Sequence, residues 1–204
     1  MINKVKIYNR FNIEMFINSG GINFPYREYP WYLISIHTSD DDLLTPENKT
    51  ILEEMGCKSA ISLRFGDITD KQLAEMKPSH RDKLVNDKNI TLFNTEQAKT
   101  VIGFLLYCSQ DEQQGVLIAH CDAGVSRSGA IGTFAVDFFN LDYQEFTKEN
   151  PHVRPNYYVL RLLRNAAGFK PLTLAELNER DAENKTIQDK ETQQKIKEGG
   201  IFLP

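Results

Sequence analysis

The chain has 204 residues, of which 41% are hydrophobic and 25% are charged, and its formal net charge at pH 7 is −4. This composition is ordinary for a globular domain with an extension, and the longest apolar runs are far below the ~20 residues that span a bilayer. A mildly acidic chain favours neither nucleic acid nor an anionic membrane as its partner.

The first half of the chain predicts strands and helices in alternation. Residues 5–8 predict a short strand, and residues 10–18 predict a helix that ends before a pair of glycines. The apolar, partly β-branched run 31–36 predicts a buried strand. A threonine cap followed by proline predicts a helix over 46–55. Period-two alternation over 60–65 predicts another strand.

The second half continues the alternation after a polar, irregular stretch at 68–92. Asn94 and Gln97 form a capping box in front of a helix that carries one apolar face. The short apolar run 116–119 suits a strand that is buried on both faces. Three further helices are predicted after this strand: one that starts near Arg127 and carries an apolar inner face between 130 and 139, and two at 143–149 and 155–167.

Alternating strands and helices indicate an α/β fold, in which helices flank a central and mostly parallel sheet. We assign this domain to residues 1–170. From residue 171 to residue 204 the sequence becomes charged and amide-rich, with no aromatic residue before Phe202. We interpret 171–204 as a solvated helical or disordered extension beyond the core.

The three cysteines, Cys57, Cys108 and Cys121, are widely and irregularly spaced. An odd number at such spacing does not indicate a disulfide framework and fits a reducing compartment. The first residues show no secretory leader pattern. We therefore expect a cytoplasmic protein. For Cys57 and Cys108 we expect core positions without a chemical role.

The segment from His120 to Ser128 reads His-Cys-Asp-Ala-Gly-Val-Ser-Arg-Ser and joins the predicted strand 116–119 to a predicted helix. A loop between a strand and a helix turns its backbone N–H groups inward, and the helix N-terminus adds partial positive charge, so the loop is an anion cradle. Glycine permits the tight turn, and an arginine fork can bind two phosphate oxygens. The residues expected to bind a phosphate are Asp122, Ala123, Gly124, Val125, Ser126 and Arg127.

Cys121 lies at the floor of this predicted cradle, where positive surroundings favour the thiolate, the form that attacks phosphorus. Ser128 offers a hydroxyl that can stabilise the sulfur and help it leave. We expect His120 to donate a hydrogen bond to nearby backbone and to fix the loop. The alternative, an inert buried thiol, does not explain why Arg127 stands at the helix start.

The pattern H-C-x5-R-S at 120–128 resembles the signature of the cysteine-based protein tyrosine and dual-specificity phosphatase superfamily, and especially its small microbial members. The resemblance covers residues 30–168 and includes Pro155-Asn156 before an apolar helix. It implies a phosphatase fold of dual-specificity size and a phosphocysteine intermediate on Cys121. It also implies a phosphorylated protein as substrate, phosphotyrosine above all, with no metal or cofactor. We expect a monomer.

Members of this superfamily use an aspartic acid on a mobile loop as the general acid, and four residues are candidates: Asp67, Asp70, Asp82 and Asp87. We prefer Asp67, because it directly follows the predicted strand 60–65 and because Phe-Gly-Asp-Ile at 65–68 is similar to the acid loop of microbial relatives. Asp87 fits the usual spacing to the cysteine better but has no predicted strand before it.

Two other classes of function stay open. One is a related enzyme with a Cys and Arg loop, such as a phosphoinositide or RNA phosphatase, an arsenate reductase or a sulfurtransferase. The loop contains Asp122 and no lysine, which argues against polyanionic substrates, and no resolving cysteine is near Cys121 in the sequence. The other is a catalytically weak phosphate-binding module, which keeps the cradle and lacks the acid.

Overall fold

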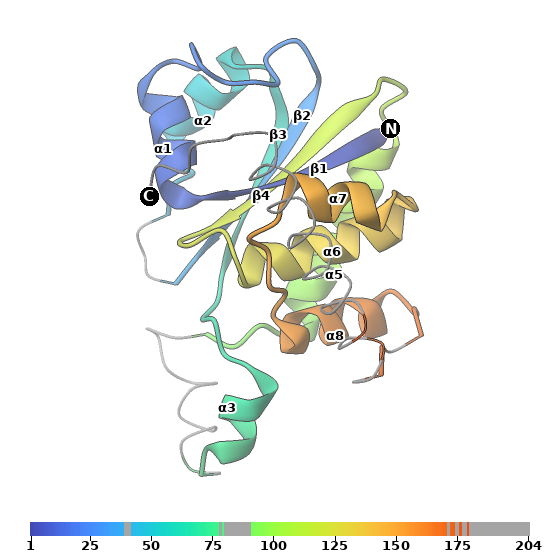
Figure 1. Cartoon of the computed structure of the whole chain (residues 1–204). Helices are drawn as coiled ribbons and strands as arrows, with labels where there is room; N and C mark the ends of the chain where they lie inside the picture. Colours follow the sequence, from blue (N-terminus) through green and yellow to red (C-terminus); the bar gives the residue numbers. More distant parts are fainter. Residues whose placement is uncertain are drawn as a thin grey trace, which may run out of the picture.

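The computed structural model describes residues 1–38, 42–77, 79, 91–170, 172, 173, 176 and 179. Within these residues four strands form one parallel sheet in the order β1-β4-β2-β3 (Figure 1). The bounds of the strands are β1 (Ile2–Asn9), β2 (Trp31–His37), β3 (Cys57–Arg64) and β4 (Gly115–Cys121). The predicted α/β fold with a central parallel sheet is confirmed.

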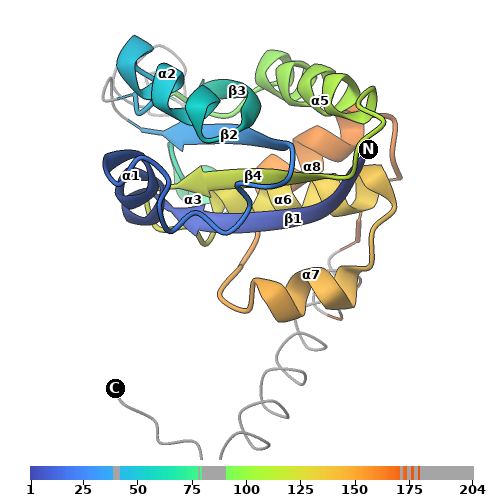
Figure 2. The same cartoon turned by 90° about the horizontal axis from the view of Figure 1, so that it is seen from above.

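Helices lie on both faces of this sheet, which gives three layers (Figures 1 and 2). One face carries α1 (Arg10–Asn18) and α2 (Pro46–Glu54). The other face carries α5 (Thr95–Ser109), α6 (Arg127–Phe139) and α8 (Tyr157–Ala166). The short α7 (Tyr143–Glu149) packs on β1 and α6, and α3 (Asp70–Glu75) follows β3.

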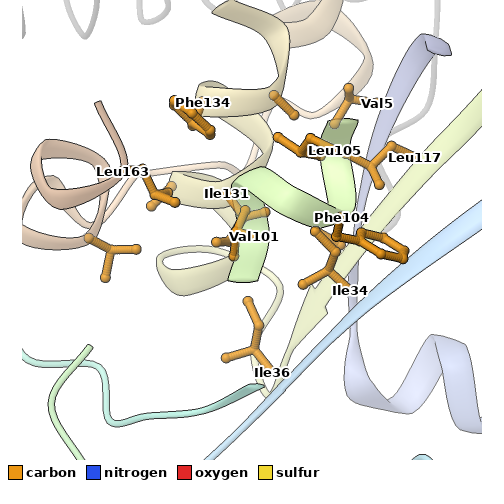
Figure 3. Packing of buried hydrophobic residues seen from close by; sticks show 14 of the residues in the cluster. Val5, Ile34, Ile36, Val101, Phe104, Leu105, Leu117, Ile131, Phe134 and Leu163 are labelled. Carbon is orange, nitrogen blue, oxygen red and sulfur yellow. The ribbon is translucent and has the colours of Figure 1, made fainter. Parts of the chain in front are cut away.

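The larger hydrophobic cluster fills the space between the sheet and the layer of α5, α6 and α8 (Figure 3). Phe134 of α6, Leu105 of α5 and Leu117 of β4 are fully buried there. Truncation of a buried phenylalanine to alanine typically costs about 3–5 kcal/mol of unfolding free energy. This packing therefore holds α6, whose N-terminus follows the predicted cradle, firmly against the sheet.

A second cluster lies under α1 and α2 and contains Phe24 and Trp31, whose ring centroids are 4.5 Å apart. The two clusters use alternate residues of each strand, because successive side chains point to opposite faces of a sheet. In β4, Leu117 and Cys121 belong to the larger cluster, whereas Ile118 belongs to the second.

The topology places β4 between β1 and β2, so the loop after β4 has a neighbouring strand on each side. All described strands are parallel, so their carboxyl ends meet at one edge of the sheet. Asn9 at the end of β1 is in register with Cys121 at the end of β4. Functional sites of open parallel sheets lie at this edge.

The observed bounds refine the predicted ones. Helices α1 and α7 have the predicted limits, while β1 starts at Ile2 and β3 starts at Cys57, earlier than the sequence pattern indicates.

The polar stretch 68–92 contains α3, and most of 78–90 lies outside the described residues. The predicted extension 171–204 also lies outside them, apart from four single residues. In the described part of the chain no helix is long and apolar enough to cross a membrane.

Candidate active site

The loop 122–126 joins the end of β4 to the start of α6. Ser126 is the N-cap residue of α6, yet its side chain makes no capping hydrogen bond. The first N–H groups of a helix have no partner within the helix, and here the side chain of the cap residue does not accept a hydrogen bond from them. Together with the N-terminal end of the helix dipole, these groups form a site suited to an anion.

Gly124 is required by the path of this loop. Its φ is +69°, a left-handed conformation that side chains rarely adopt. A Cβ atom at this position would lie 2.6 Å from the backbone nitrogen of Asn9 and 2.7 Å from the carbonyl oxygen of Tyr8. The loop therefore packs directly on the end of β1, and only glycine fits there.

Cys121 and Ser128 meet beneath the loop. The Cys121 Sγ lies 3.1 Å from the Ser128 Oγ, and both residues are buried. Cys121 is the last residue of β4, and Ser128 lies in the first turn of α6, so the buried strand and the helix fix this contact. A hydroxyl at this distance can donate a hydrogen bond to a thiolate sulfur.

Arg127 is held by the ends of two other strands. Its Nη1 donates to the Thr38 Oγ1 at 2.7 Å and to the Phe65 carbonyl oxygen at 3.0 Å. Its Nη2 donates to the Asp122 Oδ2 at 2.6 Å. Burial raises the pKa of Asp122, but the hydrogen bond and charge of Arg127 outweigh it and bring the pKa below its ordinary value. The Nε is buried and has no partner among the described residues.

The structure places Asp67 beside the loop. Its Oδ1 accepts hydrogen bonds from the Ser126 Oγ at 2.7 Å and from the Asn156 Nδ2 at 2.8 Å. Asp70 lies elsewhere and pairs with Arg161 at 2.7 Å. The other two candidate acids, Asp82 and Asp87, lie outside the described residues. Among the described candidates, Asp67 is therefore the one hydrogen-bonded to the loop.

Asn156 has a central place that the sequence analysis missed. It caps α8 by accepting from the Val159 N at 3.2 Å, and its own backbone N donates to the Ser126 carbonyl oxygen at 3.0 Å. Its Nδ2 donates to Asp67 and also to the Ile68 carbonyl oxygen at 3.1 Å. The sequence signal was the Pro-Asn pair before an apolar helix, which predicts a cap but not the two contacts with the acid segment.

The connection between α7 and α8 holds the loop from outside. The Arg154 backbone N donates to the Val125 carbonyl oxygen at 3.1 Å. The His152 side chain is hydrogen-bonded to the backbones of Ile7 and Gly124, and burial, with the charge of Arg154, lowers its pKa. His152 thus joins the loop to β1 and is mainly neutral at pH 7.

His120 does not have the predicted role of a donor to the loop. Its ring is buried, and neither ring nitrogen has a hydrogen-bond partner in the described part of the chain. Because it precedes Cys121 in a strand, its side chain points to the opposite face of the sheet, toward the layer of α1 and α2. Burial lowers the pKa of His120 to about 4, so the imidazole is neutral at pH 7.

All three cysteines are free thiols. Burial raises the pKa of Cys57 to about 12 and that of Cys108 to about 12, so both are thiols at neutral pH. Cys57 begins β3 and Cys121 ends β4. In this parallel sheet the two cysteines therefore lie at opposite ends along the strand direction. The core positions predicted for Cys57 and Cys108 agree with their burial.

No family model and no curated protein matches this sequence. A comparison with solved structures matches Tk-PTP in its active form, at 13% identity and a TM-score of 0.37, covering 89% of this chain and 90% of that chain. It also matches the PTP-2 phosphatase of Cydia pomonella, at 16% identity and a TM-score of 0.44, covering 79% of this chain and 84% of that chain.

Proposed function

We propose that this protein hydrolyses phosphate monoesters on proteins through a phosphocysteine intermediate on Cys121. Phosphotyrosine is the main substrate, with phosphoserine and phosphothreonine as further ones. The observation that carries this proposal is the gathering of a thiol, a guanidinium and a carboxylate around one loop at a helix N-terminus. The three groups belong to Cys121, Arg127 and Asp67.

In the first step the Cys121 thiolate attacks phosphorus, so that an S–P bond forms while the bond from phosphorus to the ester oxygen breaks. Asp67 donates its proton to the departing oxygen. The proton is held on Oδ2, since Oδ1 already accepts from Ser126 and Asn156. These two contacts support the role of Asp67 because they hold its carboxyl group beside Ser126, at the end of the loop that follows Cys121.

In the second step Asp67, now a carboxylate, takes a proton from water while the water oxygen attacks phosphorus. The S–P bond breaks, phosphate leaves, and the thiolate returns. Ser128 donates a hydrogen bond to the departing sulfur, and its 3.1 Å distance from Sγ supports this role.

Arg127 and the loop N–H groups stabilise the charge on the phosphoryl oxygens in both steps. The transition state of phosphoryl transfer is largely dissociative, so a fixed cradle acts by position and charge. Because the loop itself supplies this positive potential, we propose that the reaction needs no metal or cofactor.

A phosphate-binding module without catalysis would keep the loop and lack a general acid. The hydrogen bonds of Asp67 to Ser126 and Asn156 favour the enzyme over the module. A phosphoinositide substrate is disfavoured by the carboxylate of Asp122 on the loop, since extra phosphates would be repelled there.

Turnover of a chromogenic aryl phosphate in the presence of EDTA tests the proposal. We expect the wild type to be active, Cys121→Ser to be inactive, and Asp67→Asn to lose about 10²–10³-fold in kcat with its affinity for inorganic phosphate nearly unchanged. Binding of a phosphopeptide without turnover in the wild type would favour the module. Full activity in Asp67→Asn would move the acid to another residue.

A further inference from the structure

Asp122, the loop residue directly after Cys121, occupies the phosphate-binding side of Arg127. The Asp122 Oδ2 accepts from the Arg127 Nη2 at 2.6 Å, and the Thr38 Oγ1 lies 3.4 Å from the same oxygen. The arginine side chain is 6% exposed, whereas the aspartate side chain is 49% exposed. The guanidinium is thus fixed by the protein, while the carboxylate reaches solvent.

The two edges of this guanidinium are used differently. The Nη1 donates to Thr38 and to the Phe65 carbonyl oxygen, so the ends of β2 and β3 satisfy it. Nε and Nη2 lie together on the edge that binds two oxygens of a carboxylate or phosphate. On this edge Nη2 is bound to Asp122, and Nε is buried without a partner among the described residues. A buried donor without a partner is costly, so this edge is suited to an incoming ligand.

We propose that Asp122 determines substrate specificity, because in the free protein its carboxylate takes the place on Arg127 that a substrate phosphoryl oxygen must take. On binding, the phosphoryl group bonds Nε and Nη2, and Asp122 turns toward solvent. Its negative charge then stands beside the phosphorylated residue. A substrate with a cationic side chain next to that residue is favoured, and an acidic or doubly phosphorylated one is disfavoured. The inference rests on the proposed function, because it names the substrate class of the same site.

The surrounding charges support a cationic neighbour rather than an anionic one. Asp67, exposed beside the same loop and hydrogen-bonded to Ser126, holds its proton in the substrate complex and adds no positive charge there. Arg10, whose charge acts on Asp122, forms an ion pair with Glu14 at 2.6 Å. Once the phosphoryl group neutralises Arg127, the carboxylate of Asp122 stays beside the bound phosphorylated residue and attracts a lysine or arginine of the substrate.

Binding of inorganic phosphate tests the displacement without any need for turnover. Calorimetry on Cys121→Ser is compared with the double variant that also carries Asp122→Asn, which keeps the shape of the side chain and removes its charge. We expect about tenfold tighter phosphate binding in the double variant, since a negative charge is removed from the neighbourhood of the anion. Asp111→Asn is the matched control, because Asp111 precedes β4 and so lies about 20 Å from the loop.

Hydrolysis of two phosphotyrosyl peptides, with arginine or glutamate next to the phosphotyrosine, tests the substrate class. We expect the wild type to prefer the arginine peptide in kcat/KM by about tenfold, and Asp122→Asn to reduce this preference to about twofold or less. Equal or weaker phosphate binding after Asp122→Asn, or an unchanged peptide preference, would overturn the inference. An inactive wild type whose phosphate binding still tightens in the double variant would overturn the proposed function and leave the displacement standing.

Discussion

Asn156 offers the sharpest test of how this site is built, because one side chain serves two separable purposes. Its Oδ1 accepts from the Val159 N and caps α8, while its Nδ2 donates to Asp67 and to the Ile68 carbonyl oxygen. Asn156→Ala removes both, whereas Asn156→Asp keeps a good capping acceptor, loses the donor and places a second carboxyl group beside Asp67. The pair of variants therefore separates the stability of the helix from the positioning of the acid.

The magnitudes follow from these contacts. Loss of an N-cap costs about 1 kcal/mol, and loss of a hydrogen bond to a charged group costs about 1.5–3 kcal/mol, less at a partly exposed site. We expect Asn156→Ala to lower the free energy of unfolding by about 2–3 kcal/mol, or Tm by roughly 4–12 °C for a domain of this size. Asp67 keeps its bond to Ser126, so kcat should fall by about tenfold rather than by the full loss expected for Asp67→Asn.

The assay is kcat and KM on an aryl phosphate, with Tm measured on the same samples. For Asn156→Asp we expect at least the tenfold fall in kcat with a nearly unchanged KM and a smaller loss of Tm than in Asn156→Ala. Full kcat in Asn156→Asp would refute the positioning role, since the donor to Asp67 would then be irrelevant to the reaction. If the loss of kcat were proportional to the loss of Tm in both variants, the role of Asn156 would be limited to capping α8.

Three further predictions concern the loop and the buried titratable groups. Gly124→Ala should abolish phosphate binding in calorimetry while the far-UV circular dichroism stays native, because a Cβ would collide with the end of β1; retained affinity would contradict the required left-handed turn. His120 has a pKa of about 4 when folded against about 6.5 unfolded, so the unfolded chain binds more protons between these values. Stability should therefore fall by up to about 3 kcal/mol as pH drops from 6.5 to 4, with a shallower slope in His120→Gln, as measured by urea unfolding. Iodoacetamide at pH 7 should modify Cys121 before Cys57 and Cys108, whose pKa values are raised by burial; equal labelling in peptide mass spectra would contradict the thiolate.

Much of the fold could be predicted because its signals are local. The limits of α1 and α7 follow from capping and turn residues close in the sequence, and the capping box of Asn94 and Gln97 is present in the structure. The place of the loop between strand and helix could also be predicted, because a buried strand, a glycine and a helix start are adjacent in the chain. The strands β1 and β3 were predicted too short, since their first residues pair with neighbours that the pattern does not reveal.

The sequence by itself determined the layered fold and the position of the loop proposed as an anion cradle, because strand, loop and helix there are contiguous and their geometry is set by local backbone preferences. Only the tertiary structure decided which groups surround that cradle. The contact of Asp67 with Asn156 joins residues 89 positions apart, and Arg127 is fixed by Thr38, also 89 positions away. Such contacts depend on the order of strands in the sheet, which brings their carboxyl ends to one edge and which local preferences do not specify.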